Sequence, residues 1–318
     1  MAPVVVPGVD VALLTGPLVL GYMFGYCLYG ILIVQVYIFS QLFPKERTEI
    51  KAVVYSMFFL ETVFTLFTTI SAWNQYGSAW GDVDTIFIID WAWDPLPALN
   101  GVLAGIAQSF YIYRIWSLTR TVWRPILIGC VMVTQVAISF HYGIVVSLEG
   151  RGVDKLFALS PEITVWLSLS AVADLLITIS LVQVLADRRK DANFDRISGL
   201  LNKLIRFSVE TGSVTSATAI VELILWLTCR QWNFHFIFFL LLGKLYSNML
   251  IGTLNSRGML GSGLSTTLGP PTVSMFWADM GTPTGQRSGI SDRTAGISRI
   301  THDDVDLDPD CDIVVHMN

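Results

Sequence analysis

Seven long apolar stretches dominate the sequence and constrain what it can fold into. Each has about 20 residues or more, the length that an α-helix needs to cross the hydrocarbon core of a bilayer. They cover residues 16–39, 52–72, 95–117, 125–147, 163–186, 207–228 and 234–254. Lipid offers no partner for unpaired backbone groups, and the alternating pattern of a β-barrel is absent from the sequence. We therefore predict an all-α fold, a seven-transmembrane-helix bundle.

Composition supports a membrane location. Hydrophobic residues make up 53% of the 318-residue chain and charged residues only 14%. Soluble domains carry roughly 25% charged residues and could not bury this much apolar surface in one core. Lipid must therefore solvate much of the apolar surface.

Basic residues are distributed unequally between the two sides of the predicted bundle. The first, third and fifth loops together carry twelve Lys and Arg residues, whereas the N-terminus and the even-numbered loops carry three. Cytosolic loops are enriched in Lys and Arg, so the odd-numbered loops should face the cytosol. The prediction is an extracellular N-terminus (1–15), a seven-helix domain (16–257) and a disordered cytosolic tail (258–318), in the plasma membrane or an endomembrane.

Two connections between spans leave alternatives open. Only a short link around Thr119–Trp123 separates the third and fourth spans, which makes them the hardest pair to divide. Before the sixth span, apolar residues recur at helical spacing among basic ones from 194 to 206. This run is either an amphipathic helix on the membrane surface or an extension of the sixth helix below the membrane.

The second loop, Asn74–Asp94, is aromatic and acidic and contains no basic residue. Trp and Tyr are common at the level of the lipid headgroups, so an interfacial aromatic belt is the favoured interpretation. The alternative is an acidic, aromatic lid over an outer pocket.

Polar and charged side chains inside the spans are the candidate functional residues, because lipid excludes them unless they find partners. We call them the predicted polar core: Glu61, Asp174, Glu210, Glu222, Lys244 and Asn248. Glu61 and Lys244 lie at similar depth and are expected to pair, with Asp174 as the alternative partner of the lysine. Such a core either holds the helices together or lines a cavity for a ligand, an ion or a proton; we favour the structural role.

Two further patterns concern helix packing. Thr211, Thr215, Thr218 and Glu222 are spaced 4, 3 and 4 residues apart, which places them on one helix face. Gly21-x-x-x-Gly25 and Gly101-x-x-x-Gly105 are small-residue faces, expected to serve packing within one chain rather than dimerisation.

No enzyme class is supported by the sequence. Nucleophile elbows, metalloprotease motifs and phosphate-binding loops are absent from it, so we predict no catalytic residue and no cofactor. His141, on the same span as Gln135, is expected to be a hydrogen-bonded core residue, because no second His lies at ligand spacing.

Two known classes of seven-helix protein fit poorly. A lysine in the seventh span suggests a retinal Schiff base, but the third span lacks an acid as counter-ion and residue 240 is Leu rather than an acid. G-protein-coupled receptors carry an acid before the Arg at the inner end of helix three and an Asn-Pro-x-x-Tyr motif in helix seven. The chain has Tyr113 before Arg114, and Lys244-Leu-Tyr-Ser-Asn248.

A closer resemblance covers residues 16–257 and is most specific from about 170 to 257. The motifs on which the resemblance is based are Arg188-Arg-Lys190, Leu204-Ile-Arg-Phe-Ser-Val-Glu-Thr-Gly212 and Lys244-Leu-Tyr-Ser-Asn-Met-Leu-Ile-Gly-Thr-Leu-Asn-Ser-Arg257. A further motif upstream is Gln108-Ser-Phe-Tyr-Ile-Tyr-Arg114. In these the chain resembles the DUF6534 family. That resemblance implies a multi-pass membrane protein of a mushroom-forming (basidiomycete) fungus, and it supplies no reaction or ligand.

The predicted function is that of a receptor-like or sensory membrane protein, based on the topology, the aromatic outer loop and the basic fifth loop. A small-solute or proton transporter using the intramembrane acids and Lys244 is the alternative, and a purely structural membrane protein is the third option. The expected partners are the lipid bilayer, an unknown extracellular ligand and a cytosolic partner at the 187–206 loop and the tail, with no nucleic acid.

Overall fold

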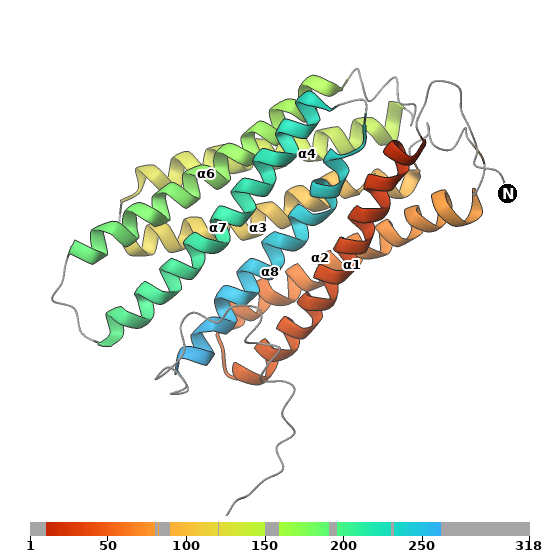
Figure 1. The fold of residues 1–318 in the computed structure, drawn as a ribbon. Helices are drawn as coiled ribbons and strands as arrows, with labels where there is room; N and C mark the ends of the chain where they lie inside the picture. Colours follow the sequence, from red (N-terminus) through yellow and green to blue (C-terminus); the bar gives the residue numbers. More distant parts are fainter. Residues whose placement is uncertain are drawn as a thin grey trace, which may run out of the picture. The chain divides into compact units, whose positions relative to one another are not determined.

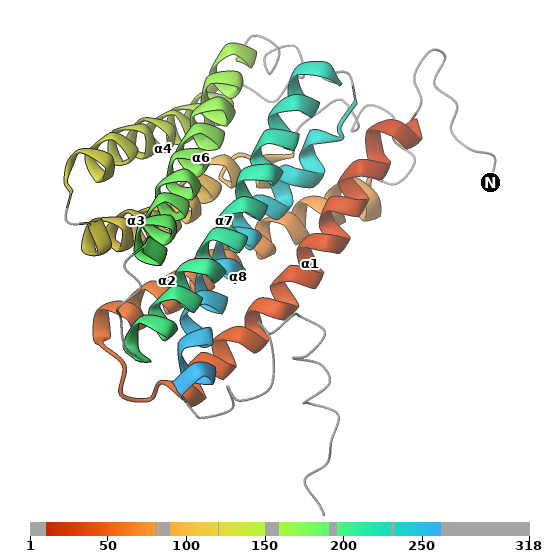
Figure 2. The same ribbon diagram turned by 60° about the vertical axis from the view of Figure 1, so that its left-hand side comes forward.

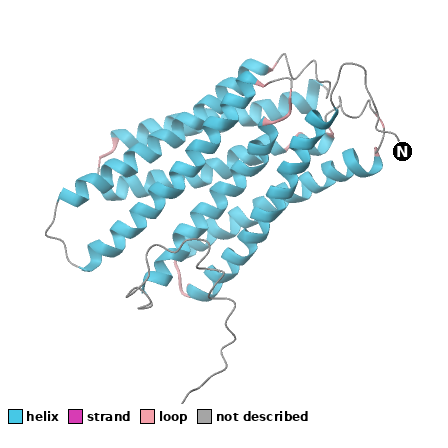
Figure 3. Cartoon of the chain, viewed as in Figure 1, coloured by secondary structure: helices cyan, strands magenta, loops and turns pink. Residues whose placement is uncertain are grey.

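The described part of the chain folds into seven long helices. A computed structural model describes residues 11–79, 82, 90–119, 121–149, 159–190, 196–229 and 232–261. The helices are α1 (Val11–Leu42), α2 (Thr48–Trp73), α3 (Leu96–Thr119), α4 (Trp123–Glu149), α6 (Ser160–Lys190), α7 (Arg196–Thr228) and α8 (His235–Gly261). A π-helical turn (Asn74–Ser78) follows α2, a short 3-10 helix (Trp91–Trp93) precedes α3, and the described residues contain no strand (Figure 3).

Every predicted span lies within one of these helices, except for the first residue of the third and of the seventh span, so the all-α seven-helix prediction is confirmed. The third and fourth spans are separate helices, because α3 ends at Thr119 and α4 begins at Trp123. The run from 196 to 206 belongs to α7, which continues without a break to Thr228. Of its two interpretations, the structure supports the extended helix. Residues 258–261, predicted as the start of the tail, belong to α8, and the rest of the predicted tail, from 262 onward, lies outside the described residues.

The structure fits an integral membrane protein. Five helical segments among the described residues are long and apolar enough to cross a membrane: Val11–Leu42, Thr48–Ser78, Trp123–Leu148, Ser160–Val184 and His235–Arg257. In α7 the apolar segment found among the described residues, Gly212–Thr228, is shorter. The other exception, α3, carries Asn100 near its start and Gln108 in its middle, and both are buried against neighbouring helices rather than exposed to lipid.

The helix α8 lies inside the bundle, in contact with α1, α2, α3 and α7 (Figures 1 and 2). The outer layer continues from α3 to α4 and α6, and α6 packs against α7. The connections alternate between the two ends of the bundle: α1–α2, α3–α4 and α6–α7 join at the end where α8 finishes (Figure 1). The basic odd-numbered loops therefore gather at one end.

Close approaches between helices occur at the two glycine motifs. A Cβ at Gly21 would lie 2.8 Å from Leu240 Cδ1, and one at Gly25 would lie 3.4 Å from Lys244 Cε, so α1 rests directly on α8. A Cβ at Gly101 would lie 2.0 Å from Ser139 Oγ on α4. Both small-residue faces pack within the chain, as the sequence predicted.

An aromatic cluster closes the end of the bundle that carries the second loop. Trp93 packs against Phe236, Phe239 and Tyr22, with ring centroids 5.0, 6.0 and 6.5 Å away. Trp91, two residues earlier, is instead about half exposed. Trp93 thus points inward and Trp91 outward. Residues 80, 81 and 83–89 of the loop lie outside the described residues, so the choice between a belt and a lid stays a prediction.

Candidate functional site

The middle of the bundle holds an ion pair between α8 and α2. Lys244 Nζ donates to Glu61 Oε2 at 3.2 Å and to Thr65 Oγ1 at 2.7 Å. Ser247 Oγ donates to the other carboxylate oxygen of Glu61 at 2.8 Å. The side chains of Lys244 and Glu61 are 3% and 0% exposed. We call Glu61, Thr65, Lys244 and Ser247 the ion-pair site.

Surrounding groups adapt this site to an apolar environment. The Lys244 ammonium lies 5.3 Å from the ring centroid of Tyr29 and 5.2 Å from that of Phe64, where ring faces attract cations. Gly243 lets α2 and α3 approach α8, because a Cβ there would lie 2.8 Å from Asn100 Oδ1 and 3.6 Å from Glu61 Oε1. The pair is therefore desolvated but well partnered, the condition under which a buried ion pair is tolerated.

A second hydrogen-bond network crosses four helices. Asp174 on α6 accepts hydrogen bonds from Gln108 Nε2 on α3, at 2.9 Å, and from the Tyr246 hydroxyl on α8. Gln108 Oε1 in turn accepts from Gln135 Nε2 on α4 at 3.1 Å. We call these four residues the Asp174 network. Asp174 is thus a partner of Tyr246, and the lysine pairs with Glu61.

The other members of the predicted polar core have different surroundings. Asn248 Nδ2 donates to the Leu28 carbonyl on α1 at 3.1 Å, so it ties α8 to α1. Glu222 is 2% exposed, and its Oε2 atom has no hydrogen-bond partner among the described residues. The Glu210 side chain is 49% exposed and pairs with Arg206 on its own helix, so it does not belong to the core.

The α7 polar stripe and His141 are two further sequence predictions on which the described residues bear, and only that for His141 was wrong. The polar stripe on α7 is only partly buried: Thr215 and Glu222 are buried, Thr218 bonds to its own helix at Val214, and the Thr211 side chain lies outside the described residues. His141 is not in the core, because its side chain is 62% exposed and pairs with Glu162 at 3.1 Å. Its six-residue separation from the buried Gln135 turns it about 120° away around the helix.

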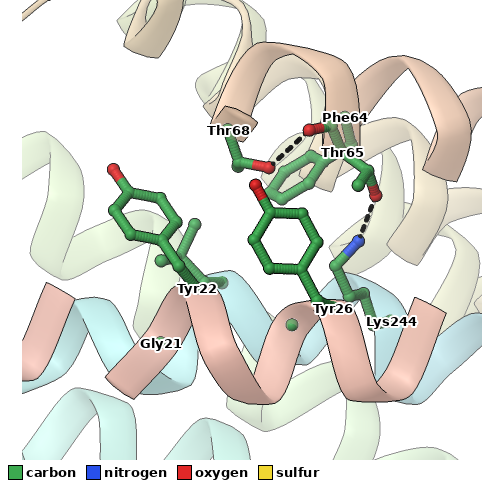
Figure 4. Close-up of a pocket in the computed structure, with 9 residues that line it drawn as sticks. Gly21, Tyr22, Tyr26, Phe64, Thr65, Thr68 and Lys244 are labelled. Carbon is green, nitrogen blue, oxygen red and sulfur yellow. Dashed lines mark hydrogen bonds between the residues drawn. The ribbon is translucent and has the colours of Figure 1, made fainter. Parts of the chain in front are cut away.

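A small pocket lies beside the ion-pair site, between α1, α2 and α8 (Figure 4). Lys244, Thr65 and Thr68 supply its polar lining, and Tyr22, Tyr26 and Phe64 supply aromatic walls. It has room for about one water molecule and is partly open. Elsewhere in the described part of the chain, no three His, Cys, Asp or Glu side chains gather in a way that could hold a metal ion.

Comparison with known proteins gives one match. Residues 170–259 match DUF6534, a family of unknown function. This match confirms the resemblance to DUF6534 over these residues. No curated protein and no solved structure shows significant similarity to it. The fungal origin and the upstream part of the resemblance stay predictions.

The DUF6534 region contributes Lys244, Ser247, Asp174 and Tyr246, whereas Glu61, Thr65 and Gln108 come from the chain before it. Both polar networks therefore join this region to the preceding helices. Sequence reasoning missed Tyr246 and Gln108, because a lone Tyr or Gln in a span is not recognisable as a partner of a distant acid. It also missed Tyr22, Tyr26 and Tyr29, although their spacing of four and three residues places them on one helix face.

Proposed function

We propose that the chain is a receptor-like or sensory membrane protein in which α8 carries a signal from the ion-pair site to one end of the bundle. The observation that supports this is the position of three α8 residues. Lys244 and Tyr246 each take part in one of the buried networks, and Arg257 lies 13 residues beyond Lys244, about 20 Å along the helix.

Arg257 connects α8 to the first loop. Its Nη2 atom lies 3.3 Å from Glu46 Oε2, and its guanidinium carbon lies 5.4 Å from the centroid of the Phe43 ring. A helix is rigid over this length, so a displacement at Lys244 would also move Arg257 relative to Glu46. Signalling of this kind needs such an element, whose position two distant sites both influence.

We also propose that this end of the bundle faces the cytosol. The support is the gathering of the basic loops there (Figure 1), which matches the rule for cytosolic loops. A protease added to the cytosolic face of sealed vesicles should remove the tail. A tail that stays protected would refute this orientation.

Spin labels test the signalling proposal. Nitroxides attached to cysteines at Lys45 and Ser256, in the full-length chain in nanodiscs, report the distance between the first loop and the end of α8. Lys244→Met should shift that distance. Ile144→Met, on a lipid-exposed α4 position, is the control and should not. Equal distance distributions in the unsubstituted chain and Lys244→Met would contradict the proposal.

A proton or small-solute transporter is the second candidate. The observation favouring it is Glu222, a buried carboxyl whose Oε2 atom has no hydrogen-bond partner among the described residues. Intramembrane acids of this kind occur in proton relays. Proton or solute flux into proteoliposomes that disappears in Lys244→Met and Glu61→Gln would overturn the receptor proposal in favour of transport.

A further inference from the structure

The seam between α1 and α2 differs from the other contacts of α1. Three tyrosines on α1 reach across it to hydroxyl groups on α2: Tyr22 to Ser71 at 3.4 Å, Tyr26 to Thr69 at 2.8 Å and Tyr29 to Thr62 at 2.8 Å. Against α8, in contrast, α1 packs through glycine. The long tyrosines hold α2 at a distance, and the pocket beside Lys244 occupies the space between them.

The mouth of this pocket lies on the lipid-facing surface. Tyr26 is 41% exposed, whereas Tyr22, Thr65, Thr68 and Lys244 are each less than 9% exposed. Figure 4 shows the Tyr26 ring beside the Lys244 side chain, between α1 and α2. Met23 and Leu66, on the same two helices, are more than half exposed, as residues in contact with lipid chains would be. A molecule dissolved in the bilayer can therefore reach Lys244 by passing Tyr26.

Lys244 has hydrogen-bonding capacity left for such a molecule. An ammonium group has three N–H donors, and Glu61 and Thr65 accept two of them among the described residues. The Thr68 hydroxyl donates to the Thr65 carbonyl at 2.9 Å, so its oxygen can still accept a hydrogen bond. The pocket thus offers one donor and one acceptor, the combination that a hydroxyl group satisfies.

The size and charge of the pocket restrict further which ligands can bind. The space beside Lys244 holds about one water molecule, which matches a single hydroxyl group rather than a phosphate or a sugar. The Glu61–Lys244 pair has no net charge, so a charged head group would bring an uncompensated charge into an apolar interior.

From access, hydrogen bonding, size and charge together, we propose that the pocket binds a neutral, membrane-dissolved alcohol. Its hydroxyl group accepts from Lys244 and donates to Thr68, and its apolar body passes Tyr26 to lie along the α1–α2 surface. That this alcohol is the signal the protein detects rests on the receptor function proposed above. The binding site itself is tested separately.

Photolabelling tests the site in the full-length chain in phosphatidylcholine nanodiscs. The probe is 1-dodecanol carrying a diazirine on its alkyl chain. The control probe is dodecane carrying the same diazirine, which lacks the hydroxyl group. The alcohol probe should label peptides containing residues 21–26 and 64–68. An excess of 1-dodecanol should reduce this labelling about five- to ten-fold more than an excess of dodecane, the effect of about one net hydrogen bond.

Variants locate the labelling in the pocket. Gly25→Val places methyl groups beside Lys244 Cε and should abolish the preference for the alcohol probe. The control is Gly30→Val on the same helix, where nothing lies within 4 Å of an added Cβ. Thr68→Val, which keeps the side-chain shape and removes the acceptor, should lower the preference several-fold and covers the case in which Gly25→Val fails to fold.

Three outcomes would overturn the proposal. They are equal labelling by the alcohol and alkane probes, labelling that Thr68→Val leaves unchanged, and no labelling of these segments. The last outcome would mean that the pocket holds only water. The receptor function fails by a different result. Specific labelling without any change in the distance between positions 45 and 256 would retain the alcohol site and refute signalling through α8.

Discussion

Removing one partner of the Glu61–Lys244 pair should destabilise the protein far more than removing both. In Lys244→Met, Glu61 keeps only Ser247 as a donor while remaining 0% exposed. Leaving one charge of a buried pair without its partner costs about 3–5 kcal/mol. We expect similar losses in the free energy of unfolding for Lys244→Met and for Glu61→Met.

The double variant Glu61→Met with Lys244→Met should recover most of this loss. Both neighbouring hydroxyl groups keep a backbone acceptor, because Ser247 also lies 3.2 Å from the Gly243 carbonyl and Thr65 donates to the Glu61 carbonyl at 2.7 Å. Two methionines of similar volume leave no buried charge, so the double variant should lie within about 1–2 kcal/mol of the unsubstituted chain. The coupling energy is then about 4 kcal/mol or more.

The assay is reversible unfolding of the full-length chain in mixed micelles by increasing dodecyl sulfate, followed by tryptophan fluorescence. The matched control is the exposed pair Arg206–Glu210 on α7, whose double-mutant cycle should give less than about 1 kcal/mol. Ordinary interhelical hydrogen bonds in membranes contribute about 0.6 kcal/mol each. A coupling energy below about 1 kcal/mol at Glu61–Lys244 would therefore refute the reasoning.

Two further predictions concern one buried hydrogen bond and one close helix contact, and the same unfolding assay measures both. Tyr246→Phe leaves one buried oxygen of Asp174 without its donor and should lower the free energy of unfolding by about 1–3 kcal/mol. Tyr113→Phe, at an exposed position, should lower it by less than about 0.5 kcal/mol, and equal effects of the two substitutions would argue against the Asp174 network. Gly21→Ala should destabilise by about 1–3 kcal/mol, because its Cβ would overlap Leu240, while Gly30→Ala should be neutral or stabilise by up to about 1 kcal/mol; a stable Gly21→Ala would contradict the close contact between α1 and α8.

Several features could be predicted from sequence because their causes are local. A stretch of about 20 apolar residues is helical in lipid whatever its neighbours, so all seven helices were found, including α3 and α4 on either side of a short link. The approximate depth of Glu61 and Lys244 follows from counting residues along each span. The high cost of a lone charge at that depth then predicts that they pair.

The rotation of each helix about its own axis, in contrast, could not be predicted reliably from sequence. Glu210 and Glu222 lie twelve residues apart on α7, which turns them about 120° from each other. One is consequently half exposed beside Arg206, and the other is buried. Only contacts with other helices decide which face of α7 points inward.

By itself, the sequence determined the helices, the unequal distribution of basic loops and the presence of buried charges, because hydropathy and charge act on each segment separately. The tertiary structure decided that α8 lies inside the bundle and that Asp174 pairs with Tyr246 and Gln108 rather than with Lys244. It also decided that Tyr22 and Tyr26 line a pocket between α1, α2 and α8. These features depend on which helix faces touch, a property of the whole packed bundle that no single segment carries.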